Sequence, residues 1–261
     1  MAKLSNIVYE INAKIPFDLK EDWDNVGLLV GDENNNISKI LFALDITDEI
    51  IEEAKREGCE LIISHHPLFF KSEVSEVLND NSAMGKVYRL IRANIAAICL
   101  HTNLDSVKGG VNDILADACG LKDIKVMQPG INENAGLGRY GFLERDMPLK
   151  DFADRVKENL KAPFIIVHDG GQIVKKVCVL GGSMPEMMIE AKKAGCDTFV
   201  TGEMKHHHYL LANELKINVL AAGHHFTEYL GLDLPIKVIT SAFPDIKIYK
   251  SNLLDNILTV V

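Results

Sequence analysis

This sequence has few long apolar runs and no closely spaced cysteine pair, and its basic residues are outnumbered by its acidic residues. Every apolar run is well short of the roughly 18 residues that a membrane helix needs, and the N-terminal stretch lacks the continuous core of a signal peptide. The five cysteines form no C-x-x-C pair, which is typical of reduced thiols and of a cytoplasmic location. With 28 basic against 37 acidic residues, the net charge of −9 argues against binding to nucleic acid or to an anionic membrane.

The sequence does have the composition and patterning of a globular α/β protein. Its 261 residues, 47% of them hydrophobic, suffice for one large domain or two moderate ones. β-Branched apolar runs flank a helical pattern twice, and alternation of this kind is typical of parallel strands. We expect strands at 40–45, 60–67, 177–182 and 197–203, around helices at 48–58 and 185–195.

Two parts of the chain resemble each other beyond this general pattern. A shift of 137 places Val30–Ser64 on Val167–Thr201 without a gap, and nine of the 35 positions are identical. Chance would give about two identities at ordinary residue frequencies. The segments DIKVM (123–127) and DIKIY (245–249) extend the match. An internal duplication explains these identities, although two generic strand–helix–strand units would share part of the pattern.

The predicted fold class is therefore α/β, with two similar α/β domains from an internal duplication and largely parallel or mixed sheets. We place the first half at residues 1–127 and the second at 128–261, because the stretch 128–138 is rich in Gly and Asn and is typical of a linker. The sequence leaves open whether the chain after about residue 222 packs with the first half or with its own.

Histidine is the residue whose placement indicates chemistry. Three expected strands end in metal-binding residue types: His65 and His66; His101 with Asp105; and His224 with Glu228. A shift of 123 superimposes the two imidazole–carboxylate pairs, whose spacing of four puts both groups on one face of a helical turn. Adjacent histidines, or one such pair, have a structural role at least as often. Their combination at strand ends favours a metal site.

The number of donors indicates two ions rather than one. A tetrahedral ion takes about four protein ligands, and a catalytic ion takes fewer. Imidazole with carboxylate, and no thiolate nearby, suits Zn, Fe or Mn. We therefore predict two divalent metal ions per chain, with Glu228 bridging them, held by His65, His66, Asp105, His224 and Glu228. The spacing leaves open which imidazole binds which ion.

Two further residues are candidates for catalysis. His101 is either an additional ligand or a group in contact with one. Glu203 follows a strand at the position that His66 occupies in the first half, so it is a candidate acid, base or substrate contact. A plain helix start, with Thr201 as the capping residue, is an equally good account of that segment.

Six motifs in order along the chain resemble one known family. They are EDWDNVGLLVG (21–31), ISHHPLFF (63–70), HTNLD (101–105), GLGRYGF (136–142), TGEMKHH (201–207) and AAGHHFTE (221–228). The chain resembles the NIF-three-like family, also labelled GTP cyclohydrolase 1 type 2 homologues, over nearly its whole length. It lacks the extra domain that longer members carry in the middle of the sequence.

The resemblance implies two similar α/β domains with a dinuclear metal site between them. It also implies a toroidal homohexamer whose sites face an inner cavity. The family's ligands map onto the five residues that the donor count selects. The label suggests ring-opening hydrolysis of GTP, so the favoured function is a metal-dependent hydrolase acting on a small molecule, in which metal-activated water is the nucleophile. The alternative is a metal-binding assembly or regulatory adaptor without turnover.

Three other features have simpler interpretations. The run His206–His208 is expected to be a solvated helix face, and the only tryptophan, Trp23, is expected to anchor its segment by packing. Gly181, Gly182 and Ser183, between a strand and a helix, form either an anion-binding turn or a plain tight turn.

Overall fold

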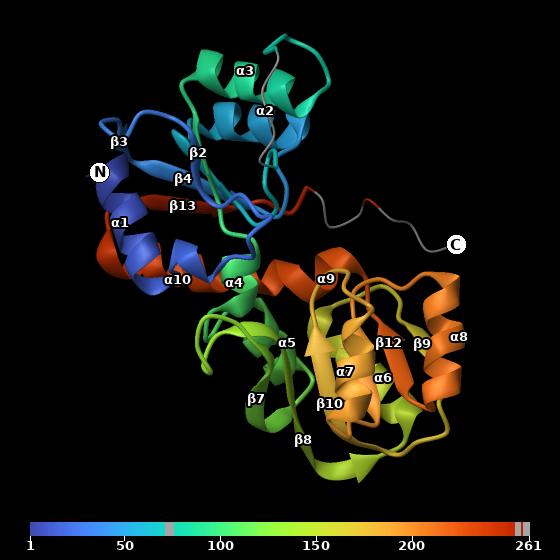
Figure 1. Cartoon of the computed structure of the whole chain (residues 1–261). Helices are drawn as coiled ribbons and strands as arrows, with labels where there is room; N and C mark the ends of the chain where they lie inside the picture. The colour runs from blue at the N-terminus through green and yellow to red at the C-terminus, as the bar shows by residue number, and fades with distance from the viewer. Residues whose placement is uncertain (71–75, 254–256, 258–261) are drawn as a thin grey trace. The chain divides into compact units, whose positions relative to one another are not determined.

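The computed structural model describes residues 1–70, 76–253 and 257, which form two compact units (Figure 1). The first unit contains Met1–Leu104 together with residues 232–253, and the second contains Asp105–Gly231. Each unit is a mixed sheet with helices on both faces, so the predicted α/β class is confirmed. Among the described residues, every helix is too short or too polar to span a bilayer.

The first unit is built on a five-stranded sheet. Its strands, in spatial order, are β13 (Lys247–Lys250), β4 (Lys39–Ala43), β5 (Leu61–Ser64), β6 (Ala96–Cys99) and β2 (Gly27–Val30). Only the edge strand β2 is antiparallel to its neighbour. The remaining elements are β1 (Ala2–Lys3), α1 (Leu4–Lys14), η1 (Phe17–Leu19), β3 (Asn36–Ile37), α2 (Asp48–Glu57), α3 (Ala83–Ala93) and α10 (Asp233–Ala242). The unit boundary falls within the short helix α4 (Thr102–Ser106).

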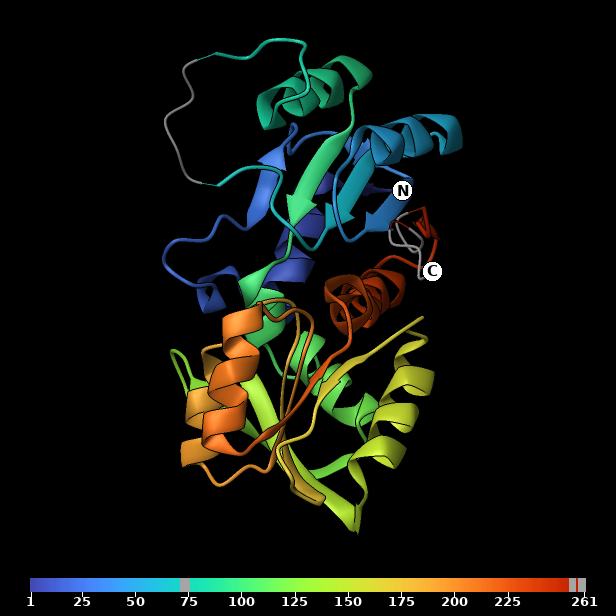
Figure 2. The same cartoon turned by 90° about the vertical axis from the view of Figure 1, so that its right-hand side faces the viewer.

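Helix α2 shows why the sequence forms these elements locally. The Thr47 side chain accepts a hydrogen bond from the backbone N–H of Ile50, and Gly58 ends the helix at φ 67°, in the left-handed region that glycine adopts without strain. Its buried face, which includes Ile50 and Ala54, joins the core over one side of the sheet. Helices α2 and α3 lie on that side, whereas α1 and α10 pack together on the other (Figures 1 and 2).

The second unit is built on a six-stranded sheet with a parallel centre. Its strands, in spatial order, are β7 (Leu121–Pro129), β8 (Gly136–Met147), β10 (Val174–Leu180), β11 (Thr198–Thr201), β12 (Asn218–Ala221) and β9 (Ile166–His168). Strands β10, β11 and β12 are parallel, and the other pairings are antiparallel. Its helices are α5 (Val111–Ala118), α6 (Leu149–Leu160), α7 (Met187–Lys193), α8 (His206–Leu215), α9 (His224–Glu228) and η2 (Tyr229–Leu232).

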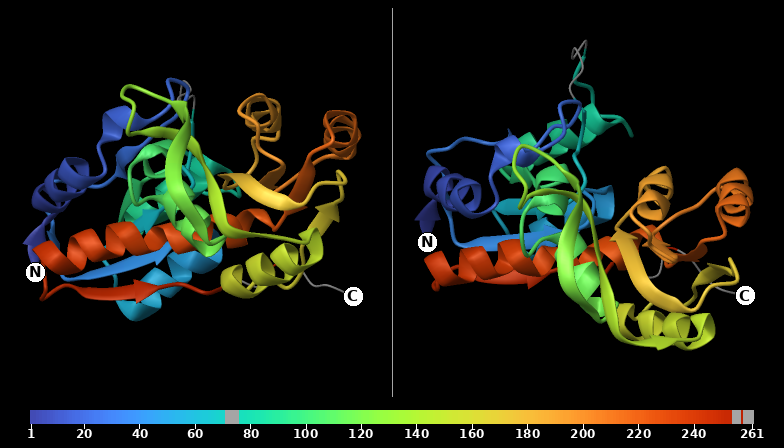
Figure 3. Two further views of the ribbon diagram at one scale, coloured as in Figure 1. Left: turned by 90° about the horizontal axis from the view of Figure 1, so that it is seen from below. Right: turned by 60° about the horizontal axis from the view of Figure 1, so that its bottom comes forward.

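Alternation along β10 divides the core of this unit between the two faces of the sheet. Val177 and Val179 belong to the cluster formed with α5 and α6, whereas Cys178 and Leu180 belong to the cluster formed with α7 and α8. Successive strand residues point to opposite faces, and β10 is apolar on both because helices cover both. The two helical layers are visible in Figure 3.

Equivalent side chains make equivalent contacts in the two units. The Glu60 carboxylate accepts the backbone N–H of Lys39 at 2.8 Å, and the Asp197 carboxylate accepts that of Lys176 at 2.7 Å. The ammonium groups of the same two lysines each donate to a backbone carbonyl at the end of the intervening helix. A shift of 137 relates both pairs, so the similarity seen in the sequence extends to tertiary hydrogen bonds.

The compact units divide the chain at positions other than the expected halves, 1–127 and 128–261. Residues 105–127 belong to the second unit, because β7 pairs with β8 over its length. The chain returns to the first unit at Leu232, where α10 packs on α1 and β13 adds to the sheet beside β4. These pairings are distant in sequence, so the composition of the segment 128–138 does not reveal them.

All five cysteines are reduced and buried, as their scattered spacing predicted. Burial raises the pKa of Cys119 to about 12 and the pKa values of Cys59 and Cys196 to about 11. At pH 8 the reactive thiolate is then about a thousandth of the population or less. We expect Ellman's reagent to leave the native protein essentially unmodified and to titrate five thiols after denaturation. Rapid modification of the native protein would contradict this burial.

Candidate metal centre

Three imidazoles converge at the carboxyl edge of the first sheet. His65 and His66 follow the last residue of β5, and His101 follows β6 by two residues. These strands are parallel neighbours, so their carboxyl ends lie side by side. One ring nitrogen of each of the three histidines lies within 4.8 Å of the others, which makes them a group that could hold a metal ion.

Hydrogen bonds at Nδ1 set the orientation of all three rings. The partners are the Leu100 carbonyl for His65 (2.8 Å), Asp45 Oδ1 for His66 (2.8 Å) and Asp24 Oδ1 for His101 (2.9 Å). Each partner is an oxygen that accepts, so Nδ1 carries the proton and the lone pair of the neutral ring is on Nε2. Metal-binding histidines in proteins have this arrangement, with the second nitrogen held by a carbonyl or carboxylate.

Asp24 is the most constrained of these acceptors. Its carboxylate is fully buried and also accepts the backbone N–H of Thr102 at 3.0 Å. Burial by itself would raise the pKa of Asp24, but the hydrogen bonds from His101 and Thr102 outweigh burial and hold the pKa well below its ordinary value. Asp24 therefore stays ionised and fixes the His101 ring beside the other imidazoles.

The second unit has an imidazole–carboxylate turn in α9. His224 follows β12, and its Nε2 lies 3.1 Å from Oε2 of Glu228, as the spacing of four in a helical turn predicted. Glu228 is only 4% exposed. The Nδ1 of His224 lies 3.5 Å from Oε2 of Glu203, a largely exposed carboxylate that follows β11. Glu203 and Glu228 thus approach the two nitrogens of one ring.

Helix α8 does not begin where a cap at Thr201 would require. It starts at His206 after Lys205, and the hydroxyl of Thr201 donates to the Gly182 carbonyl instead. Thr201 therefore secures a turn between two strand ends, and Glu203 lies outside the helix.

The turn at Gly181 and Gly182 leaves space for the side chain of Glu228. Gly182 has φ +67°, and a Cβ built there would lie 2.1 Å from Oε1 of Glu228. The two backbone N–H groups of the turn donate to Asn112 Oδ1 (3.0 Å) and Thr227 Oγ1 (3.1 Å). Both of these N–H groups have protein acceptors, which favours the tight structural turn over an anion site.

Asp105 is the first residue of the second unit, and its backbone is well anchored. Its carbonyl accepts a hydrogen bond from Asn112 Nδ2 at 3.1 Å, and Asn112 is itself buried. Asn112 thus links the end of α4 to the turn at Gly181 and Gly182, which lies next to Glu228.

Other residues singled out from the sequence lie in ordinary surroundings, although two of them, His208 and Trp23, differ from the prediction. His206 and His207 are exposed in the first turn of α8, as predicted for a solvated face, but the prediction is wrong for His208, whose side chain is only 12% exposed. His225, to which the motif gives no role, stacks on Tyr229 with ring centroids 4.9 Å apart. The expectation that Trp23 anchors its segment by packing is wrong, because its side chain is 57% exposed and the contacts of Asp24 hold the segment instead.

Asp24 and Asp45 are functional candidates that the sequence reasoning missed or undervalued. In the sequence, Asp24 is marked only by its place beside Trp23 in the motif EDWDNVGLLVG, a weak signal for a ligand contact, and Asp45 is not marked at all. The available signal for Asp45 was its position at the end of β4, at the same sheet edge as the histidines.

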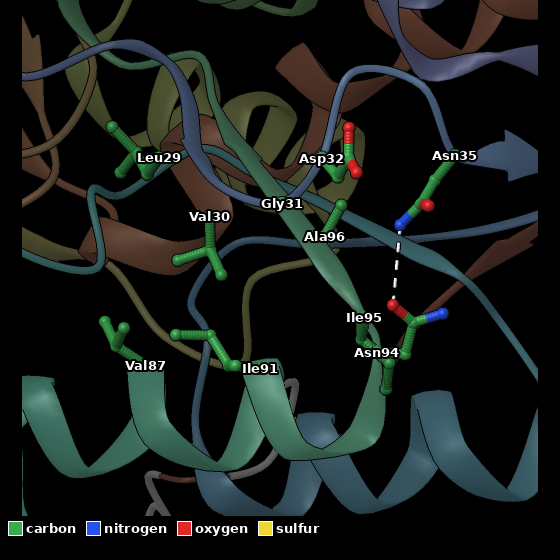
Figure 4. A pocket seen from close by; sticks show the side chains of 10 residues that line it. All are labelled: Leu29, Val30, Gly31, Asp32, Asn35, Val87, Ile91, Asn94, Ile95 and Ala96. Atoms are coloured by element: carbon green, nitrogen blue, oxygen red, sulfur yellow. Dashed lines mark hydrogen bonds between the residues drawn. The ribbon is translucent and has the colours of Figure 1, made fainter.

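A hollow of about 370 Å³ in the first unit lies between β2 and α3 (Figure 4). Leu29, Val87 and Ile91 contribute apolar side chains, and a 3.4 Å hydrogen bond joins Asn35 to Asn94 at one end. None of the three imidazoles is among the described residues that line it. This hollow is therefore separate from the candidate metal centre.

The fold and site define an α/β protein with imidazole and carboxylate groups at strand ends that could bind metal ions. The profile of the family described as Duf34/NIF3 (NGG1p interacting factor 3) matches residues 2–256. The chain belongs to this family, which confirms the resemblance seen in its motifs.

Relatives and solved structures agree with this assignment. A Clostridium perfringens protein named GTP cyclohydrolase 1 type 2 homolog is 38% identical over 229 residues, covering 87% of each chain. A Clostridium acetobutylicum protein of the same name is 38% identical over 242 residues, covering 92% of this chain and 89% of the relative. The crystal structure of a Staphylococcus aureus hypothetical protein has a TM-score of 0.89 at 29% identity, with 99% of each chain covered.

Proposed function

We propose that the chain is a metal-dependent hydrolase that binds two divalent ions through His65, His66, Asp105, His224 and Glu228. The observation that carries the proposal is the set of three imidazoles whose Nδ1 atoms are all hydrogen-bonded to oxygen acceptors. Structural histidines need no such common orientation, whereas a shared metal site requires it. The 3.1 Å approach of His224 to the buried Glu228 supports the second group of ligands.

The chemistry of the donors fits a pair of Zn, Fe or Mn ions. Imidazole and carboxylate are ligands for all three metals, and the five cysteines are buried elsewhere in the hydrophobic cores. Two such ions, when bound, lower the pKa of water and stabilise the negative charge of a hydrolytic transition state. Glu228 would be the carboxylate shared by both ions, since it is more buried than Asp105, the other proposed carboxylate ligand.

The remaining roles fall to residues beside the ligands. Asp24 keeps His101 in one orientation, so that His101 either completes the ligand set or hydrogen-bonds the substrate. The carboxylate of Glu203 is exposed and 3.5 Å from His224, which suits it to carry a proton to or from a bound substrate. The names of the relatives suggest GTP as the substrate, and we propose ring hydrolysis of GTP as the first reaction to test.

We further propose a cytoplasmic protein that assembles as a toroidal homohexamer. Buried, reduced thiols suit a reducing compartment. Light scattering of the purified protein measures the assembly directly, and the expected mass is that of six chains.

Metal content and turnover, measured on the same samples, test the proposed function. We expect two ions per chain in the parent protein and at most one in Asp105→Ala and Glu228→Ala. Turnover of GTP or a phosphoester should fall by a factor of about 100 or more in both variants, because neither can hold the ion pair. Asp154→Ala, which removes an exposed carboxylate on α6, is the matched control and should behave as the parent.

Two results would contradict the proposal in different ways. Two ions per chain in both variants would overturn the ligand assignment. Full metal loading of the parent without turnover of any substrate would overturn the hydrolase and favour a metal-binding adaptor.

A further inference from the structure

Two exposed aromatic side chains stand beside the imidazole group of the first unit. Trp23 is 57% exposed and Phe70 is 50% exposed, with ring centroids 5.9 Å apart and planes tilted by 49°. The Trp23 ring centroid lies 5.9 Å from that of His101, and the Phe70 centroid lies 6.5 Å from it. The pair therefore adjoins a candidate site residue and is in contact with solvent.

Polar contacts hold the backbone around both rings. Next to Trp23, the Asp24 carboxylate accepts the N–H of Thr102 and bonds to His101. The side-chain amide of Asn25 donates to the Phe69 carbonyl at 3.0 Å, which ties the segment of Trp23 to the segment of Phe70. The two rings are thus fixed at their backbones while their faces remain exposed, so little conformational freedom is lost when a ligand covers them.

Apolar ring surface in water carries a free-energy cost that burial would remove. A flat ring lying on an aromatic side chain recovers that cost, and base–aromatic stacking of this kind tolerates many heterocycles because each presents a π face. We propose that Trp23 and Phe70 form an aromatic platform that binds the planar heteroaromatic ring of the substrate beside His101. The inference rests on the proposed function for its site, but stacking on the platform requires no metal.

Trp23 is the only tryptophan of the chain, so its fluorescence reports on the platform directly. Titration of the full-length protein with guanosine or GTP should give a saturable change in tryptophan emission, and inorganic triphosphate, which has no ring, should give none. The change with guanosine should persist after the metal has been removed with a chelator. Absence of any saturable change with guanosine, or an equal response to inorganic triphosphate, would overturn the platform.

Variants of the neighbouring aromatic residue make the assignment specific. Phe70→Leu keeps the tryptophan reporter and should weaken the apparent affinity for guanosine about ten-fold, the order of effect that loss of one stacked ring gives. Tyr9→Leu, which removes a 71% exposed ring on α1, is the matched control and should leave that affinity unchanged. Equal affinities in Phe70→Leu and the parent would overturn the role of Phe70.

Two further outcomes separate this inference from its alternatives. A change in emission that follows dilution of the protein, and not addition of guanosine, would assign the exposed rings to a contact between copies and overturn the platform. Saturable guanosine binding in a protein without bound metal or turnover would support the platform while the proposed hydrolase fails.

Discussion

Replacing Gly182 by alanine is expected to weaken metal binding by a factor of about 10 to 100, the scale of losing a contact that orients a ligand. A Cβ at this position would lie 2.1 Å from Oε1 of Glu228 and 3.2 Å from Nε2 of His224. The nearest atom is the end of a flexible side chain, so the carboxylate moves away and the fold survives. The expected result is a protein that folds normally but in which the carboxylate of Glu228, the proposed shared ligand, is displaced.

Gly195→Ala is the matched control for this variant. Gly195 has φ +78°, close to that of Gly182, but a Cβ there would meet no atom within 4 Å. Both substitutions should cost about 1 kcal/mol in stability for the left-handed backbone. Only Gly182→Ala should lose metal affinity, measured by chelator competition or by the absorption spectrum of bound Co²⁺. Parent-like affinity in Gly182→Ala would show that the position of Glu228 does not govern the site.

Replacing Arg139 by methionine is expected to destabilise the second unit by about 3–5 kcal/mol, the usual cost of breaking a buried ion pair. Arg139 is 1% exposed, and its Nε and Nη2 bond to Asp113 at 2.9 and 3.0 Å. Its guanidinium also donates to the carbonyls of Gly136, Gly138, Ser106 and Val107. Methionine fills the volume but leaves these acceptors without their donor.

Thermal unfolding followed by circular dichroism measures this effect. At about 2–4 °C per kcal/mol for a chain of this size, the midpoint of the affected transition should fall by roughly 10 °C. Lys150→Met is the control, because the pair of Lys150 with Asp154 is exposed and its loss should leave the midpoint unchanged. Equal midpoints in Arg139→Met and the parent would mean that the guanidinium contacts contribute little net stability.

Apolar periodicity in the sequence correctly predicted individual strands and helices. The strand–helix–strand runs around α2 and α7 were expected from apolar periodicity, and the expected strands correspond to β4, β5, β10 and β11. The same reasoning placed His65, His66 and His101 after parallel strands, where a sheet edge brings them together. These inferences succeed because burial and hydrogen bonding impose a period on the sequence.

Pairing between distant segments was not predictable in the same way. The segments DIKVM and DIKIY look alike, yet β7 pairs antiparallel with β8 and β13 pairs parallel with β4. The acceptors behind the histidines were equally hidden, since an aspartate at a strand end is common and only the tertiary fold decides what it contacts. The exposure of Trp23 was missed because an apolar side chain is ordinarily assumed to be packed.

The equivalent hydrogen bonds of Glu60 and Asp197 mark the end of each sheet at which the two units are alike. They secure the start of the paired strands, whereas the shift of 137 relates Asp45, His65 and His66 at the other end to Gly182, Gly202 and Glu203. If the two halves arose by duplication, these strand ends were at first identical. The first half has adjacent imidazoles with a carboxylate behind one of them, whereas the second half has a glycine that leaves space for the carboxylate of Glu228.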